Sequence, residues 1–231
     1  MTPSPPPSGA RSAASAASRA ASAASATDRA YDHTKGRVLD GTYSGGALIT
    51  EGEVSEAVGV SRTPVREAFL RLQAEGLLRL YPKRGALVVP VSAQEIDDVM
   101  ETRGMIERFA AEKVIGSGRH REVGAQLREA LATQRKLRKS PEPFTEADRE
   151  FHGLLVAATG NRVLVDLYAA LRDRQLRMGV TALARDPQRL DRILEEHAAL
   201  ADALATGRLD DAIACVTHHL HGTEEALRHR F

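Results

Sequence analysis

The sequence has a single cysteine, no long apolar run and almost no net charge among its 231 residues. The one cysteine, Cys215, cannot form a disulfide within the chain, which favours a protein of the reducing cytoplasm. Because no apolar run approaches the length of a membrane-spanning helix, we do not expect a membrane partner. The formal net charge of +1, taken over the whole chain, does not favour any particular class of charged partner.

Residues 1–28 lack aromatic and branched apolar residues and contain no acidic residue before Asp28. Such a composition cannot build a hydrophobic core, so we predict a disordered tail rich in Ala, Ser and Pro. An acid-poor bias towards Ser and Arg is also typical of organelle transit peptides, which is the alternative interpretation.

Charge is distributed unevenly between the two parts of the chain. Residues 1–90 carry eleven Lys and Arg against eight Asp and Glu, whereas the remainder carries twenty-one against twenty-three. Positive charge attracts the phosphates of nucleic acids. This small excess is supporting evidence for a nucleic-acid partner of the first part.

Two short helices joined by a glycine-containing turn are predicted within this basic part. The first covers residues 50–58, where the opening residues fit a capping box and Gly59 suits the left-handed position after the helix. The second follows Ser61, with Ser61 or Thr63 as its cap and Pro64 tolerated in its first turn. The pair forms a helix-turn-helix, in which the second helix enters the major groove of DNA.

The second helix has one apolar and one polar face. At helical spacing, its core-facing stripe consists of Val65, Ala68, Phe69 and Leu72. The other side carries Arg62, Thr63 and Arg66. An Arg pair at this spacing is by itself most often a solvated face. The succession of capped helix, turn and second helix within one small domain favours DNA contact instead.

A β-hairpin is predicted directly after the second helix. Two β-prone runs, residues 77–80 and 86–89, flank a turn that contains Gly85. This turn also carries Lys83 and Arg84, which suit contact with phosphates or the minor groove. A hairpin in this place is typical of the wing of a winged helix-turn-helix.

The string GVSRTPVREAFLRLQAEGLL, followed by PKRGALVV, resembles the winged helix-turn-helix of GntR-type bacterial transcription regulators. The resemblance implies a DNA-binding domain, here residues 29–90, whose first helix we place over residues 28–40. It also implies operator contacts by Arg62, Thr63 and Arg66, with Ser61 on a phosphate.

Past Pro90 the pattern changes to helices almost without interruption, separated by Pro and Gly. The predicted helices cover residues 92–116, 119–138, 145–159, 161–180, 187–205 and 209–228. Since no β-rich stretch follows Pro90, residues 91–231 should form an all-helical bundle, which makes the whole chain mainly α.

Polar side chains interrupt the apolar stripes of three of these helices. Asp148 and His152 lie one turn apart, while His197 and His219 each continue the stripe of a later helix. A single inward His is most often a hydrogen-bonded core residue. Three His and one Asp directed into one interior favour a divalent transition metal, such as zinc, with nickel or manganese as alternatives.

Three strings in this half resemble the metal-binding effector domain of FadR-like regulators, the FCD type. They are D-x-x-F-H, E-H-x-x-L-x-x-A-L and H-L, at residues 148–152, 196–204 and 219–220. The resemblance implies that the metal is held by Asp148, His152, His197 and His219. The nearby His218 and His221 turn away from the stripe and are left out.

Arg103 lies on the inner stripe of the helix predicted over residues 92–116. A guanidinium that faces a bundle interior can bind a carboxylate with two parallel hydrogen bonds. Pairing with Glu107, one turn further on, is an equally good interpretation. In similar regulators the effector is often a small organic acid held near the metal, so Arg103 is our candidate effector-binding residue.

The sequence therefore predicts a ligand-responsive, homodimeric regulator that binds operator double-stranded DNA in the bacterial cytoplasm, at the nucleoid. Dimerisation follows from the resemblance and from the two-fold symmetry usual among helix-turn-helix proteins. One alternative is a metal-dependent hydrolase fused to a DNA-binding module, although no HExxH pair or nucleophile motif is present. Another is a nonspecific architectural DNA-binding protein whose C-terminal half only dimerises.

Overall fold

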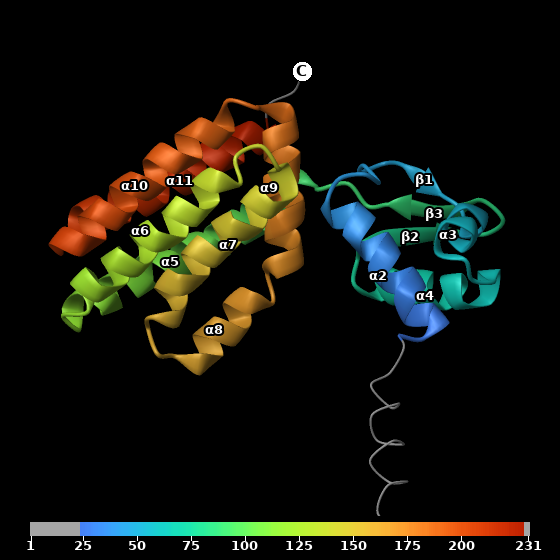
Figure 1. Cartoon of the computed structure of the whole chain (residues 1–231), viewed down its shortest axis with the longest axis horizontal. Coiled ribbons are helices and arrows are strands. Elements are labelled where there is room, and N and C mark those ends of the chain that lie inside the picture. Colours follow the sequence, from blue (N-terminus) through green and yellow to red (C-terminus); the bar gives the residue numbers. More distant parts are fainter. Residues whose placement is uncertain (1–23, 229–231) are drawn as a thin grey trace, which may run out of the picture. The chain divides into compact units, whose positions relative to one another are not determined.

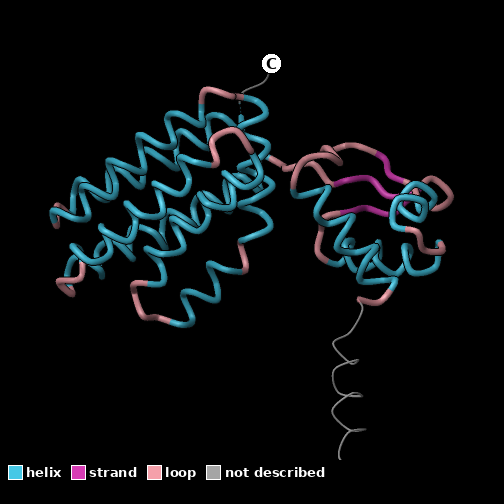
Figure 2. The backbone as a smooth tube through the Cα atoms, viewed as in Figure 1, coloured by secondary structure: helices cyan, strands magenta, loops and turns pink. Residues whose placement is uncertain are grey.

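The computed structural model describes residues 24–228 and divides the chain into two compact units. Of the described residues, 24–36 and 48–88 belong to the first unit, and 37–47 and 89–228 belong to the second. Strands occur in the first unit, whereas the second is built from helices (Figure 1, Figure 2). The fold is mainly α, as predicted.

The first described helix, α2 (Ala26–Leu39), begins earlier than the predicted residue 28. The Ser25 hydroxyl accepts a hydrogen bond from the Asp28 backbone at 3.0 Å and donates one to the Asp28 carboxylate at 2.7 Å. These bonds cap the first turn. Residues 26–28 are thus helical and not part of a tail, while residues 1–23 of the predicted tail lie outside the described residues.

The first unit combines the predicted pair of helices with a three-stranded antiparallel sheet of order β1-β3-β2. Its further elements are β1 (Leu48–Ile49), α3 (Glu51–Val58), α4 (Arg62–Ala74), β2 (Leu78–Tyr81) and β3 (Gly85–Val88). Strands β2 and β3 form the predicted hairpin, with Leu80 opposite Ala86. Strand β1 was not predicted, because two residues carry no alternation pattern.

Local signals in the sequence explain both ends of α3. The Thr50 side chain accepts from the Glu53 backbone and the Glu53 carboxylate accepts from the Thr50 backbone, so the predicted capping box is complete. Gly59 takes the left-handed conformation after the helix, with φ 69°. Ser61 precedes α4 but makes no side-chain capping bond, unlike our expectation.

The second unit consists of seven helices among the described residues, packed around one apolar core. They are α5 (Ala93–Gly116), α6 (His120–Lys136), α7 (Pro141–Ala157), α8 (Arg162–Ala169), α9 (Arg172–Arg185), α10 (Arg189–Thr206) and α11 (Leu209–Arg228). Helix α10 packs against α6 and α11, and α11 packs against α5. No helix in the described part of the chain is both long and apolar enough to cross a membrane.

Two predicted helix boundaries in this unit are wrong. Helix α7 begins at Pro141 and not at residue 145, because a proline in the first turn needs no backbone hydrogen bond. The helix predicted over residues 161–180 is two helices, which part at Ala170 and Leu171. No Pro or Gly marks this break. Helix α8 packs against α5 and α7, whereas α9 packs mainly against α7 and α11, so tertiary packing divides them.

Helix α9 is tied to the start of the second unit through Arg177. Its guanidinium donates to the Val89 carbonyl at 3.2 Å and to both Glu95 carboxylate oxygens at 2.6 and 2.8 Å. The predicted capping box of α5 is therefore only half formed. Ser92 accepts from the Glu95 backbone at 3.1 Å, but the Glu95 side chain is used by Arg177.

Candidate metal centre and nucleic-acid interface

Helix α4 presents the polar face that the sequence predicts, since Arg62, Thr63 and Arg66 are exposed while the apolar stripe is buried. A terminal nitrogen of Arg62 lies 3.7 Å from the position that a Cβ atom would take on Gly52. The Nε atom of Arg66 lies 3.9 Å from a Glu51 carboxylate oxygen, and its side chain is 75% exposed. Both guanidinium groups therefore extend over the start of α3 and are accessible to phosphates or base edges.

A groove of about 490 Å³ lies between α3, α4 and the hairpin. It is lined by three predicted cationic residues, Arg62, Arg66 and Lys83. Ser61, Thr63 and Arg84 are exposed but do not line it. The structure thus brings part of the predicted DNA-binding set into one positively charged groove.

Gly85 has a structural reason to be glycine. Its φ of +108° is rare for other residues, and an added Cβ atom would lie 2.2 Å from the Ile49 carbonyl oxygen of β1. Lys83 also has a positive φ, of 61°, within the same turn. Gly85 therefore lets β1 approach β3 and sets the shape of the turn that carries Lys83 and Arg84.

The four predicted metal ligands meet at one point between α7, α10 and α11. His152, His197 and His219 are buried, and Asp148 lies at the edge of the group. The Nε2 atom of His152 lies 3.1 Å from the Nε2 atoms of both other histidines, and Asp148 Oδ1 lies 3.4 Å from His197 Nε2. One possible ligand atom from each residue lies within 4.8 Å of all the others.

The outer nitrogen, Nδ1, of each histidine faces an oxygen of a different polar side chain. The three pairs, each 2.8 Å apart, are His152 with Glu107, His197 with Gln134, and His219 with Glu196. The pair of His152 and Glu107 is a close electrostatic contact and not a well-aligned hydrogen bond. An oxygen beside Nδ1 favours the proton on that nitrogen, which leaves the lone pair of Nε2 directed at the common point.

This arrangement fits a metal ion by its chemistry. The Nε2 lone pair of His152 lies 3.1 Å from the Nε2 atoms of His197 and His219, and these lone pairs repel one another unless a cation lies between them. Burial, with the charges of neighbouring side chains, lowers the pKa of His197 and His219 well below the usual value. Both rings are therefore neutral at pH 7, which is the form that binds metals. Three nitrogens and one carboxylate suit zinc and similar divalent ions.

Arg103 forms an ion pair with Glu107, which was one of the two interpretations of this residue from the sequence. The Arg103 Nε atom and the Tyr168 hydroxyl each donate to the same Glu107 oxygen at 2.8 Å. Burial alone would raise the pKa of Glu107, but the charge of Arg103 and the neighbouring His152 outweigh it and hold that pKa well below its usual range. Glu107 is thus a carboxylate shared between Arg103 and His152.

Arg189 orients a second carboxylate beside the cluster. This side chain is buried and pairs with Glu196 through both terminal nitrogens, one at 2.7 Å and the other at shorter range. It also donates to the His219 carbonyl at 2.8 Å and to the Thr223 hydroxyl at 3.1 Å. Glu196 is therefore fixed where it faces His219 Nδ1.

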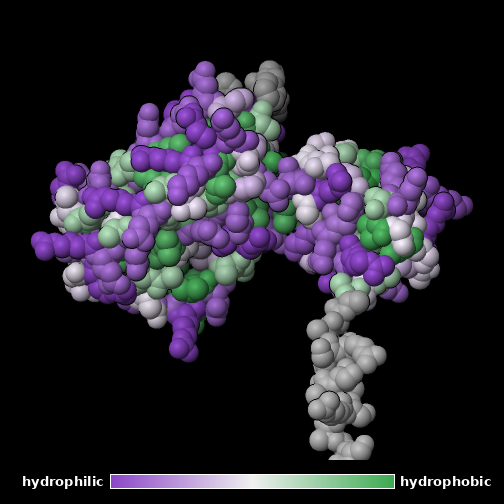
Figure 3. Space-filling model, viewed as in Figure 1, coloured by the Kyte–Doolittle hydropathy of each residue, from purple (hydrophilic) through white to green (hydrophobic). Residues whose placement is uncertain are grey.

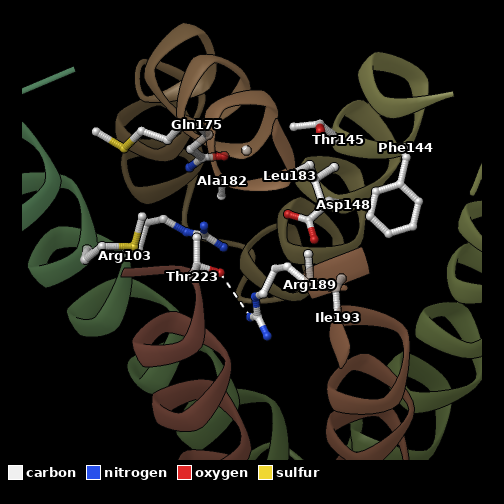
Figure 4. A pocket seen from close by; sticks show the side chains of 13 residues that line it. Arg103, Phe144, Thr145, Asp148, Gln175, Ala182, Leu183, Arg189, Ile193 and Thr223 are labelled. Atoms are coloured by element: carbon white, nitrogen blue, oxygen red, sulfur yellow. Dashed lines mark hydrogen bonds between the residues drawn. The ribbon is translucent and has the colours of Figure 1, made fainter. Parts of the chain in front are cut away.

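A small cavity of about 20 Å³, with room for about one water molecule, lies beside the cluster. Its polar lining consists of Arg103, Thr145, Asp148, Gln175, Arg189 and Thr223, and its large apolar lining of Met100, Phe144, Met178, Leu183 and Ile193. Figure 4 shows the terminal nitrogens of Arg103 and the carboxylate of Asp148 directed towards its middle.

Sequence reasoning missed the side chains that orient the histidines. Glu196 directly precedes His197 in the sequence. Arg189 lies seven residues before Glu196, on the same face of the helix. Those spacings were a usable signal, whereas nothing near Gln134 indicates its partner. His218 and His221 have exposed side chains, in agreement with their exclusion.

Comparison with protein families assigns both halves of the chain. Residues 26–88 match the bacterial regulatory proteins of the gntR family, and residues 98–222 match the FCD domain. The transcriptional repressor RspR of Escherichia coli K12 is 31% identical over 192 residues, which cover 79% of this chain and 80% of that protein. The galactonate operon transcriptional repressor of the same strain is 28% identical over 202 residues, which cover 77% of this chain and 86% of that protein.

Solved structures share the fold. The structure of E. coli McbR/YncC has a TM-score of 0.65 at 22% identity, over 88% of this chain and 97% of that one. A GntR regulator from Rhodococcus sp. RHA1 has a TM-score of 0.68 at 21% identity, over 88% and 99%. The relatives are transcription regulators and not enzymes, which rejects the hydrolase alternative. The chain belongs to the GntR family of bacterial transcription regulators, with an FCD domain as its C-terminal half.

Proposed function

We propose that this GntR-family regulator binds operator double-stranded DNA as a homodimer in the bacterial cytoplasm, and that its FCD domain senses a small organic acid at a metal centre. The observation that carries the proposal is the meeting of Asp148, His152, His197 and His219 beside a cavity lined by Arg103. The exposed cationic groove of the first unit supplies the surface for DNA.

Zinc is the metal that we propose, with nickel or manganese as alternatives. Asp148 and the three histidines would hold it, while Glu107, Gln134 and Glu196 keep the imidazole rings in place. When bound, the metal supplies a Lewis-acidic position for an oxygen of the organic acid.

Arg103 anchors the carboxylate of the acid in this proposal. Its Nε atom is occupied by Glu107, and its terminal nitrogens face the cavity (Figure 4). These donors suit the planar, two-point binding of a carboxylate. An acid larger than one water molecule must widen the cavity and shift the helices that line it. Such a shift alters the spacing of two recognition helices in a dimer, and with it the affinity for the operator.

The test is a fluorescence anisotropy titration of metal-loaded protein against a labelled duplex selected from a random pool. A small organic acid is expected to change the dissociation constant at least about tenfold, and a chelator is expected to remove this response. Equal affinity with and without acid and chelator would show that the FCD domain only dimerises. Equal affinity for the selected and a scrambled duplex would indicate a nonspecific architectural protein.

The homodimer is supported by exposed apolar side chains on two neighbouring helices. Met105 and Phe109 lie one turn apart on α5, and Val163 and Leu167 lie one turn apart on α8, each between 46% and 68% exposed. Helix α8 packs beside α5, and Figure 3 shows hydrophobic surface over α8. Large apolar side chains gathered on a surface mark protein interfaces. We propose that a second copy of the chain covers this patch.

Replacing both Phe109 and Leu167 by aspartate is expected to convert the dimer to a monomer, because two charges per protomer would have to be buried without partners. Light scattering after size-exclusion chromatography measures the mass. Leu48→Asp is the matched control, since Leu48 is equally exposed but lies on β1. A double variant that still elutes with the mass of a dimer contradicts this interface.

A further inference from the structure

An open groove of about 480 Å³ lies between α10 and α11, on the outer side of the histidine cluster. Its lining includes the exposed His218, the carboxylate of Glu196 and the buried Arg189. Arg189 also lines the small cavity that contains Asp148. This one side chain therefore belongs to the walls of both the groove and the cavity.

The Arg189 guanidinium fills the space between the two helices at this point. An added Cβ atom on Gly222 would lie 2.9 Å from one of its terminal nitrogens, so the group packs directly against the backbone of α11. Figure 4 shows its hydrogen bond to Thr223 at the cavity. Its Nε atom is buried and has no hydrogen-bond partner among the described residues. Such a donor is costly, and movement of the side chain towards water would satisfy it.

Glu196 connects the groove to the cluster through two histidines that are adjacent in the sequence. One of its carboxylate oxygens lies 3.8 Å from His218 Nε2, and the other lies 2.8 Å from His219 Nδ1. The His218 side chain is 73% exposed, whereas His219 is 2% exposed. Imidazole and carboxylate are both ligands of zinc. A pair of possible ligands thus extends from the solvent to the edge of the cluster.

The charges of the groove do not oppose the approach of a cation. Its lining carries three arginines and three carboxylates, namely Arg185, Arg189, Arg192, Asp186, Glu196 and Glu225. Two of the arginines, Arg189 and Arg192, each pair with one of these carboxylates. The formal charges of the six side chains sum to zero, so the lining as a whole does not repel a divalent ion.

We propose that this groove is the route of metal entry, in which His218 and Glu196 bind a divalent ion first and the Arg189 guanidinium then moves aside to open the cavity. The inference rests on the proposed metal centre and concerns how that centre is filled. Removal of Arg189 alone would leave Glu196 as an unpaired buried charge. An ion bound to Glu196 replaces the charge of the guanidinium, so the carboxylate keeps a partner while the cavity opens.

A residue of the route affects rates and not affinity. His218 contacts the ion during entry and exit but is not one of the four ligands of the filled centre. Its loss therefore raises the barrier to uptake and the barrier to release by the same amount. A residue that oriented His219 would instead change the affinity for the metal.

Rates of zinc uptake and release test this route. Metal-free full-length protein is mixed with Zn²⁺ in a stopped-flow instrument, and a fluorescent zinc indicator reports the uptake. Release is measured by transfer of zinc from the loaded protein to an excess of chelator. His218→Ala is expected to slow both rates about tenfold and to leave their ratio, the dissociation constant, unchanged. His221→Ala is the matched control, because His221 is 66% exposed on the same helix but does not line the groove.

Arg189→Lys tests the side chain that closes the cavity. Lysine keeps a positive charge beside Glu196 but lacks the planar group that packs against Gly222. The variant is expected to take up and release zinc at least about tenfold faster than the wild type. Its thermal unfolding midpoint shows whether the fold is kept. Because His218 is exposed, the first variant tests the route even if this buried substitution unfolds the protein.

Each contrary outcome identifies what fails. Wild-type rates in His218→Ala overturn the groove as the route and leave the proposed metal centre in place. A weaker affinity in His218→Ala, with uptake unchanged, shows that this residue supports the filled centre instead. A folded Arg189→Lys protein that exchanges zinc no faster than the wild type overturns the closing role of Arg189. Wild-type protein that takes up no zinc overturns the metal centre itself, and this inference with it.

Discussion

Replacing His197 by alanine is expected to lower the metal content of the purified protein from about one ion per chain to a small fraction of that. His197 supplies one of four possible ligand atoms within 4.8 Å of one another, and no other histidine in the described chain belongs to this group. Loss of a single orienting partner costs about 10- to 100-fold in metal affinity, so loss of a ligand should cost more. Elemental analysis after dialysis measures this, and Asp148→Ala should show a loss of the same kind.

The control for this experiment lies on α11. His221→Ala removes a histidine two positions after His219, but its side chain is 66% exposed and lies 3.2 Å from the Glu225 carboxylate, outside the cluster. It should therefore retain the full metal content. A His197→Ala protein that keeps its metal, with an intact helical circular dichroism spectrum, would show that the four residues are only a polar core.

Replacing Arg62 or Arg66 by alanine is expected to weaken operator binding by about 1–3 kcal/mol, or roughly 5- to 150-fold, if each reads a base edge. Both side chains line the groove between α3, α4 and the hairpin. Their loss should also reduce discrimination between the operator and a scrambled duplex. Fluorescence anisotropy with both duplexes, at one fixed salt concentration, measures the two effects.

Arg71→Ala is the control that removes a positive charge from α4 outside the groove. Arg71 lies on the same helix but pairs with Asp28 at 2.8 Å and does not line the groove. It removes the same charge and should leave operator discrimination unchanged. Should the three variants weaken both duplexes equally, the arginines act only through general attraction to phosphate.

The sequence was most informative where function depends on local pattern. The capping box at Thr50, the left-handed Gly59 and the stripe on α4 are each set within a few residues, and all three are present. The inward histidines could likewise be predicted, because each occupies a position where the helical period of its helix predicts an apolar residue. Such contradictions mark places where tertiary structure supplies a partner.

Partners themselves could not be predicted in the same way. His197 Nδ1 faces Gln134, sixty-three positions away in the sequence, and no spacing relates the two. The Glu95 side chain could complete a capping box with Ser92 or form an ion pair. Because α9 packs nearby, the Glu95 carboxylate binds Arg177. The division between α8 and α9 has the same origin, since each buries its side chains against different neighbours.

The bonds from Arg177 to Val89 and Glu95 bear on how a signal leaves the cavity. Helix α9 carries Gln175 and other residues of the lining, and Val89 directly follows the last residue of the wing strand β3. The first residues of the second unit are therefore held to α9. If the proposed ligand shifts α9, the helix must either break these bonds or draw Val89 and Glu95, at the start of its own unit, along with it.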